Sequence, residues 1–242
     1  MCGRYAFISG RNVQKTYDLF RNIQNAAEAF KSLPRYNAAP MQRLPVFAVR
    51  DNVLTAEIMQ WWLVPHWSKT NKTEFSTFNA KAETLEKSKL YSPYFKGSRC
   101  LVPADAFYEW KKTTATGDKD GKKQEVVEKQ PMCIRLNDEA PILFAGLFSV
   151  WKDPEGKELP TFTIITTQPN ELMASIHNRM PVILPEKHFE QWLDRDFKDT
   201  EKLQKLLVPY PAGTMKAYRV SRLVSNSRND SPECLEPEKA NT

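Results

Sequence analysis

Short strand-like segments follow one another along most of this chain, and helices do not alternate with them in a regular way. The segments combine β-branched or aromatic residues with partial alternation of apolar and polar positions, as strands do. We expect strands over residues 44–50, 54–63, 99–102, 106–111, 130–136, 142–150, 161–167 and 218–220. A doubly wound parallel sheet would require a helix between successive strands. The pattern therefore predicts an α+β fold with a mainly antiparallel, barrel-like β core and peripheral helices.

The predicted helices are few. Residues 12–31 place Val13, Tyr17 and Phe20 at helical spacing, and Pro34 ends the pattern. Shorter helices are expected over residues 82–90, 170–176, 186–193 and 200–207.

The chain is expected to form one domain. No linker or internal repeat divides its 242 residues. We assign the domain to residues 1–230 and a frayed tail rich in Pro, Glu and Lys to residues 231–242. The Lys-rich segment 112–129 has few apolar residues, so we expect a flexible hairpin or loop insertion there, and we favour solvated filler over a DNA surface. Nothing in the pattern demands more than a monomer.

Composition narrows the class of protein. With 41% hydrophobic and 11% aromatic residues, the chain is expected to be globular. It has no apolar run long enough to span a bilayer and no basic-then-apolar signal pattern. We therefore expect a cytoplasmic protein, associated with the nucleoid if its source is bacterial, with no membrane partner. The net charge of +6 favours a polyanionic partner, although solvated lysines would give the same sum.

The four cysteines are Cys2, Cys100, Cys133 and Cys234, and they are widely scattered. They form no CxxC pair and no Cys/His spacing suited to zinc, so we expect free thiols and no metal site. No cofactor is implied either.

Cys2 has a chemistry that no internal residue can have. If Met1 is removed, Cys2 carries a free α-amine and a thiol on adjacent carbons. The amine can form an imine with an aldehyde, and the thiol can then close a five-membered thiazolidine ring. The ordinary pKa values of the two groups, about 7.7–8.0 and about 8.5, leave reactive fractions near neutral pH. Alternatively, Cys2 is a small buried side chain with no chemical role.

Three further polar residues lie among apolar neighbours. Glu109 is flanked by Tyr108 and Trp110, and burial there would raise its pKa and allow proton exchange near pH 7. If Glu109 instead faces solvent, it has no such role. Asn79 is either a site residue or the cap of a following helix. His177 is either a site residue or a capping or core histidine.

Ordered motifs from residue 2 to about residue 229 closely resemble the SRAP family, the SOS-response-associated peptidase proteins, also called abasic-site processing proteins. The chain begins Met-Cys-Gly-Arg-Tyr, and the motifs cover residues 1–5, 35–40, 61–65, 79–84, 103–110, 176–181 and 220–221. Their common order makes the resemblance far more specific than any one motif.

The resemblance implies a sensor of abasic sites in single-stranded DNA. Such a protein forms a covalent thiazolidine cross-link through its N-terminal cysteine after Met1 removal, which shields the lesion, and it has a lyase-like character. The matching positions imply that Cys2 is the nucleophile, that Asn79 orients or polarises the sugar, that Glu109 is the general acid/base, and that His177 assists proton transfer.

The resemblance also implies DNA contacts. Arg4, Arg35 and Lys81 would contact phosphates, and Trp67 would pack against the nucleic acid, where stacking on a base contributes about 1–3 kcal/mol. Lys81 departs from the family pattern, in which arginine is common, and a lysine cannot make the bidentate contact.

Two other functions stay open. In a cysteine peptidase, Cys2 would attack a peptide bond with His177 as base, and the expected cleavage is loss of the protein's own Met1. In a reversible single-stranded DNA-binding module, Cys2 would be structural, and binding would weaken steeply with salt.

Overall fold

The computed structural model of the chain describes residues 2–119 and 122–238. Its larger sheet closes into a barrel in the order β10-β4-β3-β6-β9-β10. The strands are β3 (Arg43–Arg50), β4 (Val53–Trp61), β6 (Arg99–Ala104), β9 (Ile142–Lys152) and β10 (Glu158–Thr167). The β4–β10 pair is parallel and the other neighbours are antiparallel, so the barrel is mixed. The short strands β5 (Asn79–Lys81) and β11 (Met180–Pro181) pair with β10.

The turn between β3 and β4 shows how local sequence sets the barrel register. Asp51 and Asn52 both have positive φ, 50° and 61°, which are the left-handed conformations that Asp and Asn tolerate. A two-residue turn of this kind pairs Arg50 directly with Val53. The strands and the turn predicted from the sequence are confirmed here.

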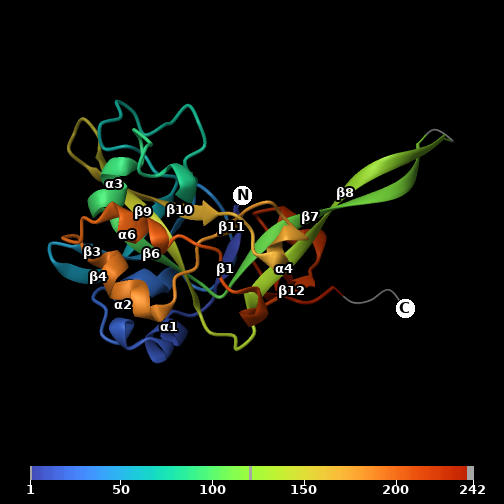
Figure 1. The fold of residues 1–242 in the computed structure, drawn as a ribbon, viewed down its shortest axis with the longest axis horizontal. Helices are drawn as coiled ribbons and strands as arrows, with labels where there is room; N and C mark the ends of the chain where they lie inside the picture. Colours follow the sequence, from blue (N-terminus) through green and yellow to red (C-terminus); the bar gives the residue numbers. More distant parts are fainter. Residues whose placement is uncertain (1, 120–121, 239–242) are drawn as a thin grey trace.

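A second sheet lies beside the barrel and carries the long hairpin that projects in Figure 1. Its order is β12-β8-β7-β1-β2, and all its pairs are antiparallel. The strands are β1 (Tyr5–Phe7), β2 (Arg35–Ala38), β7 (Ala106–Lys119), β8 (Lys122–Leu136) and β12 (Met215–Arg219). Residues 112–119 and 122–129 continue β7 and β8 as paired strands, which is the hairpin alternative expected for this segment.

The helices are short and peripheral (Figure 1). They are α1 (Gly10–Thr16), α2 (Ala26–Ala29), α3 (Ser92–Gly97), α4 (Glu171–Ala174), α5 (Phe189–Leu193) and α6 (Thr200–Lys205), with 3-10 turns that include η3 (Ala82–Thr84), η4 (Glu186–His188) and η7 (Pro232–Cys234). Among the described residues, no helix is long and apolar enough to cross a membrane.

The prediction of one long helix over residues 12–31 was wrong. The segment breaks into α1, two 3-10 turns and α2. Asn25 adopts a left-handed conformation with φ of 59°, and the carbonyl of Gln24 accepts a hydrogen bond from the Ala56 N–H at 2.9 Å. A backbone carbonyl bonded to the neighbouring strand cannot continue a helical ladder, so this tertiary contact overrides the helical spacing.

The segment from Ser231 differs from the frayed tail expected there. Cys234 is buried, and the Glu238 N–H donates to the Arg219 carbonyl at 2.8 Å. Residues 231–238 thus pack against the second sheet, while 239–242 lie outside the described residues. The single α+β domain with a barrel-like core is confirmed by the closed barrel.

Asp230 ties this C-terminal segment to β2. Its carboxylate accepts hydrogen bonds from the N–H groups of Tyr36 at 2.6 Å and Asn37 at 2.9 Å, and it pairs with Arg35 at 3.0 Å. Asp230→Ala would leave two backbone donors without this acceptor, so we expect the free energy of unfolding in urea to fall by about 2–4 kcal/mol. Asp18→Ala, which breaks an ion pair whose carboxylate is 82% exposed, should change it by less than about 0.5 kcal/mol. An equal effect of both substitutions would contradict this role.

Candidate active site

Pairing of β1 with β7 brings the chain's amino-terminal end to Glu109. Tyr5 lies opposite Phe107, and the Tyr108 N–H donates to the Arg4 carbonyl at 3.0 Å. Continuing this antiparallel register places Gly3 opposite Glu109 and Cys2 opposite Trp110, so Cys2 lies next to Glu109. The side chains of Cys2 and Glu109 are both buried. Met1 is still attached in this chain, so the Cys2 nitrogen here belongs to a peptide bond.

The Cys2 thiol is held in its protonated form. Burial raises its pKa well above the ordinary value, and the nearby Glu109 carboxylate raises it further. The positive amino terminus and the Arg4 N–H counteract only part of this shift. The buried location fits the alternative that Cys2 has no chemical role. The adjacent Glu109 carboxylate, however, supplies the proton acceptor that a reactive Cys2 would need.

Glu109 is 3% exposed, which overturns the alternative that it faces solvent. Burial raises its pKa to about 7, while the positive amino terminus and the Trp110 N–H act in the opposite direction. A carboxyl with this pKa is present in both protonation states at neutral pH, so it is suited to general acid/base catalysis.

His177 lies in the loop after α4, and its Nδ1 is 3.8 Å from the Glu109 Oε1. Burial lowers its pKa, and the charges of the amino terminus, Lys112 and Arg179 also lower it. The Arg179 N–H lies 3.1 Å from Nδ1 and the Arg179 carbonyl 3.3 Å. A neutral ring can accept from that N–H and a protonated ring can donate to that carbonyl, so the backbone of Arg179 supports either state.

Asn79 begins β5 and does not cap the following turn, whose first flanking residue is Lys81. Its amide donates to the carbonyls of Phe78 at 3.0 Å and Ile164 at 3.4 Å. Its Oδ1 is buried and accepts no hydrogen bond among the described residues. Since a buried carbonyl oxygen without a donor is costly, Asn79 has an acceptor available for a ligand hydroxyl.

A cavity of about 430 Å³ opens beside Glu109 and His177, and its other lining residues are Trp110, Lys112, Lys129 and Ser225. Cys2, Glu109 and His177 thus form one site, whereas the hydrogen bonds of Asn79 connect it to β10 instead. Across the described ranges, no group of three His, Cys, Asp or Glu side chains is arranged to hold a metal ion.

Comparison with known proteins extends these findings. A family model described as SOS response associated peptidase (SRAP) matches residues 1–227. The chain belongs to the SRAP family.

Relatives of this SRAP protein match nearly its whole length. "Abasic site processing protein YoqW" of Bacillus subtilis is 39% identical, with 98% of this chain and 99% of the relative covered. "Abasic site processing protein HMCES" of Gallus gallus is 34% identical, with 98% and 78% covered. A solved structure of a Bacteroides thetaiotaomicron protein has a TM-score of 0.81 at 25% identity, with 98% and 100% covered.

Among the residues expected to contact DNA, Arg4 lies beside the cavity that Glu109 and His177 line. Its guanidinium sits 6.0 Å from the ring centroid of Trp110 and donates to the Ser225 carbonyl at 3.4 Å. Arg35 is engaged by Asp230, so the structure gives it a structural role that the sequence did not predict.

Trp67 and Lys81 are both exposed. The Trp67 ring is 51% exposed and stacks on Tyr94 at 5.9 Å between centroids, with Phe75 and Lys72 lining the same hollow. An exposed indole held on a second ring is available for stacking. The structure therefore leaves both residues accessible without linking either to Glu109.

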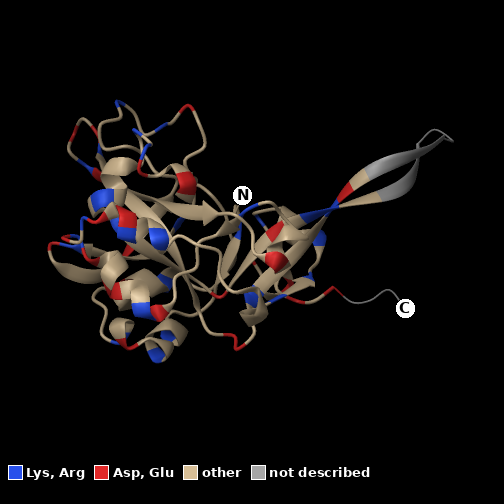
Figure 2. Ribbon diagram, in the orientation of Figure 1, with Lys and Arg blue, Asp and Glu red and all other residues tan. Residues whose placement is uncertain are grey.

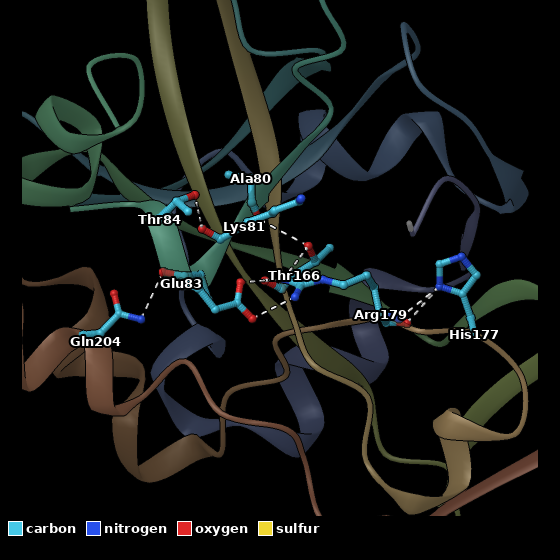
Figure 3. A network of polar contacts seen from close by, with 9 residues as sticks. Ala80, Lys81, Glu83, Thr84, Thr166, His177, Arg179 and Gln204 are labelled. Carbon is cyan, nitrogen blue, oxygen red and sulfur yellow. Dashed lines mark hydrogen bonds and ion pairs between the residues drawn. The ribbon is translucent and has the colours of Figure 1, made fainter. Parts of the chain in front are cut away.

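Sequence reasoning missed Arg179, although it lies within a quoted motif. Its guanidinium makes two hydrogen bonds to the Glu83 carboxylate, at 2.7 Å and 2.9 Å, and a third to the Thr166 carbonyl at 2.6 Å (Figure 3). These contacts anchor the His177 loop to β10 and η3. The sequence does place an acidic residue, Glu83, in one motif and a basic residue, Arg179, in another. The spacing of the two motifs along the chain cannot show that these residues meet.

Glu83→Ala should loosen this loop and admit water around His177. Because burial is the largest cause of the lowered His177 pKa, we expect that pKa to rise toward its ordinary value, together with a stability loss of about 0.5–1 kcal/mol. Proton NMR can resolve the titration, since the chain has three histidines. Glu28→Ala, which breaks an exposed pair with Lys31, should leave the His177 titration unchanged. An unchanged titration in Glu83→Ala would show that the anchor does not position the ring.

Proposed function

We propose that this protein recognises abasic sites in single-stranded DNA and captures them covalently through Cys2 after Met1 has been removed. The observation that carries the proposal is the placement of an amino-terminal cysteine beside Glu109, a buried carboxyl with a pKa of about 7. Membership of the SRAP family and the names of the relatives support the same lesion.

The first bond forms between nitrogen and carbon. The ring-opened deoxyribose of an abasic site has an aldehyde, and the neutral α-amine of Cys2 attacks its carbon. The resulting carbinolamine loses its hydroxyl as water when Glu109 donates a proton to it, which leaves a protonated imine (an iminium) and a Glu109 carboxylate. A protonated fraction of Glu109 near pH 7 makes this donation possible.

The second bond forms between sulfur and the same carbon. The Cys2 sulfur adds to the iminium carbon, the thiol proton passes to the Glu109 carboxylate, and the C=N electron pair moves onto nitrogen, which becomes the neutral ring amine. One water is released overall, and the product is a thiazolidine. Since burial keeps Cys2 protonated, the reaction needs a nearby base, and Glu109 has just become one.

His177 and Asn79 assist at the sugar. His177, 3.8 Å from Glu109, is placed to exchange a proton during opening of the closed sugar. The Asn79 Oδ1 can accept a hydrogen bond from a sugar hydroxyl. Arg4, Lys81 and Trp67 would hold the strand, and Arg4 contacts Trp110 and Ser225, which both line the cavity.

The raised thiol pKa argues against a general cysteine peptidase. Such enzymes need a thiolate, and their reactive cysteines have lowered pKa values in electropositive surroundings. Here burial and a neighbouring carboxylate raise it. Self-removal of Met1 remains compatible with the proposal, because it occurs once and at a residue adjacent to Glu109.

The deciding experiment mixes the protein with an oligonucleotide that carries one abasic site and separates the products on a denaturing gel. Intact mass is measured first to establish whether Met1 is absent. A shifted band that survives heating supports covalent capture. Reversible binding with no such band, in protein that lacks Met1, would reject the proposal in favour of a simple DNA-binding module.

A further inference from the structure

The base of the β7–β8 hairpin places two like charges opposite each other. Antiparallel pairing sets Lys112 directly across from Lys129, and both side chains are exposed. Both line the cavity that contains Glu109 and His177. Figure 2 shows Lys and Arg at the point where the hairpin leaves the body of the protein. Like charges directly opposite on a sheet are destabilising, so this arrangement needs a physical reason.

The carboxylate next to this pair, Glu128, is already bound by Arg222, so it does not compensate Lys112 and Lys129. Arg222 pairs with Glu128 at 2.8 Å, one residue from Lys129. Within the described part of the chain, neither Lys112 nor Lys129 forms an ion pair. The positive charge of Lys112 acts on His177 and lowers its pKa, which places it within electrostatic range of the site.

We infer that Lys112 and Lys129 together bind one DNA phosphate, the one adjacent to the abasic sugar held in this cavity. This inference rests on the proposed function and adds a binding subsite to it. An anion between the two ammonium groups would remove their mutual repulsion, and lysine binds phosphate as a point charge. Trp110 lines the same cavity and would offer an indole surface near that phosphate.

Segment 112–129 was predicted to be solvated filler, and its base has a different use under this inference. A strand held by the phosphate at Lys112 and Lys129 passes directly over Glu109 and His177, so the hairpin would set the register of the lesion. The same phosphate would oppose the effect of Lys112 on His177.

The test uses a single-stranded oligonucleotide with a tetrahydrofuran abasic analogue, which has no aldehyde and cannot be cross-linked. Affinity is measured against salt concentration for the wild type and for Lys112→Ala/Lys129→Ala. We expect the double variant to bind about 5–30-fold more weakly at low salt and its log–log salt slope to be smaller by about 0.7, the value for one phosphate. Lys187→Ala/Lys205→Ala, which removes two exposed lysines from η4 and α6, is the matched control and should keep both values.

A second substitution is made in the DNA. Replacing each phosphate beside the analogue with a neutral methylphosphonate should weaken wild-type binding at one of the two positions and have no further effect on the double variant. Lys112→Arg/Lys129→Arg should restore wild-type binding. If the alanine variant loses no more affinity than the control, or if both methylphosphonates act equally on it and on the wild type, the clamp is rejected. Failure of the proposed function is separate, because it would appear as absence of a wild-type cross-link on the true abasic site.

Discussion

Cys2→Ala is expected to eliminate the heat-stable adduct with abasic DNA, a loss of more than about 10³-fold. The variant still has an α-amine after Met1 removal, so it can form an imine but cannot close the ring. We therefore expect borohydride, which reduces imines, to trap a Cys2→Ala adduct that heating otherwise destroys. This combination separates the role of the amine from the role of the sulfur.

Two controls belong to this experiment. Intact mass must show that Met1 has been removed from the variant, since an internal residue 2 has no free amine. Cys100→Ala removes another buried thiol while keeping Cys2, and it should form the adduct in full in the folded fraction of the protein. A heat-stable adduct with Cys2→Ala lacking Met1 would contradict the thiazolidine mechanism.

The β3–β4 hairpin of the barrel was predictable because its determinants are local. The turn at Asp51 and Asn52 is encoded by two residues that tolerate positive φ, and it pairs β3 with β4. The helix expected over 12–31 failed because a long-range hydrogen bond between Gln24 and Ala56 decided the backbone, and no helical period reports such a bond.

The site was predictable in identity more than in arrangement. The motifs singled out Cys2, Glu109 and His177, and the structure brings these three residues together. Whether Glu109 faced solvent or the interior depended on the β1–β7 pairing, which strand alternation alone could not decide. The resemblance implied a phosphate contact for Arg35, but it could not show the partner Asp230, which lies 195 positions away in the sequence.

Glu109→Gln is expected to slow adduct formation by about 10²–10⁴-fold, because glutamine can neither donate nor accept the proton that the imine and ring-closure steps transfer. The pH dependence gives the sharper test. As pH rises through about 7, wild-type Glu109 loses the proton that it must donate to the carbinolamine, so its contribution to the rate should fall with an inflection there. Glu109→Gln should lack that inflection and keep only the one from the α-amine, near its ordinary pKa of about 7.7–8.0.

The stability of Glu109→Gln in urea shows whether the substitution removes a catalytic group or damages the fold. The Glu109 pKa fixes the sign of the expected change in stability. Burial raises it in the folded state, so the folded protein holds this proton more tightly, and stability falls as pH rises from the unfolded pKa of about 4.3 through about 7. At pH 8 the penalty is fully present in the wild type and absent in Glu109→Gln, which should unfold at an equal or higher urea concentration. Glu57→Gln, at another carboxyl whose pKa burial raises, should leave adduct formation unchanged. Unaltered adduct kinetics and pH profile in a stable Glu109→Gln protein would remove Glu109 from the mechanism.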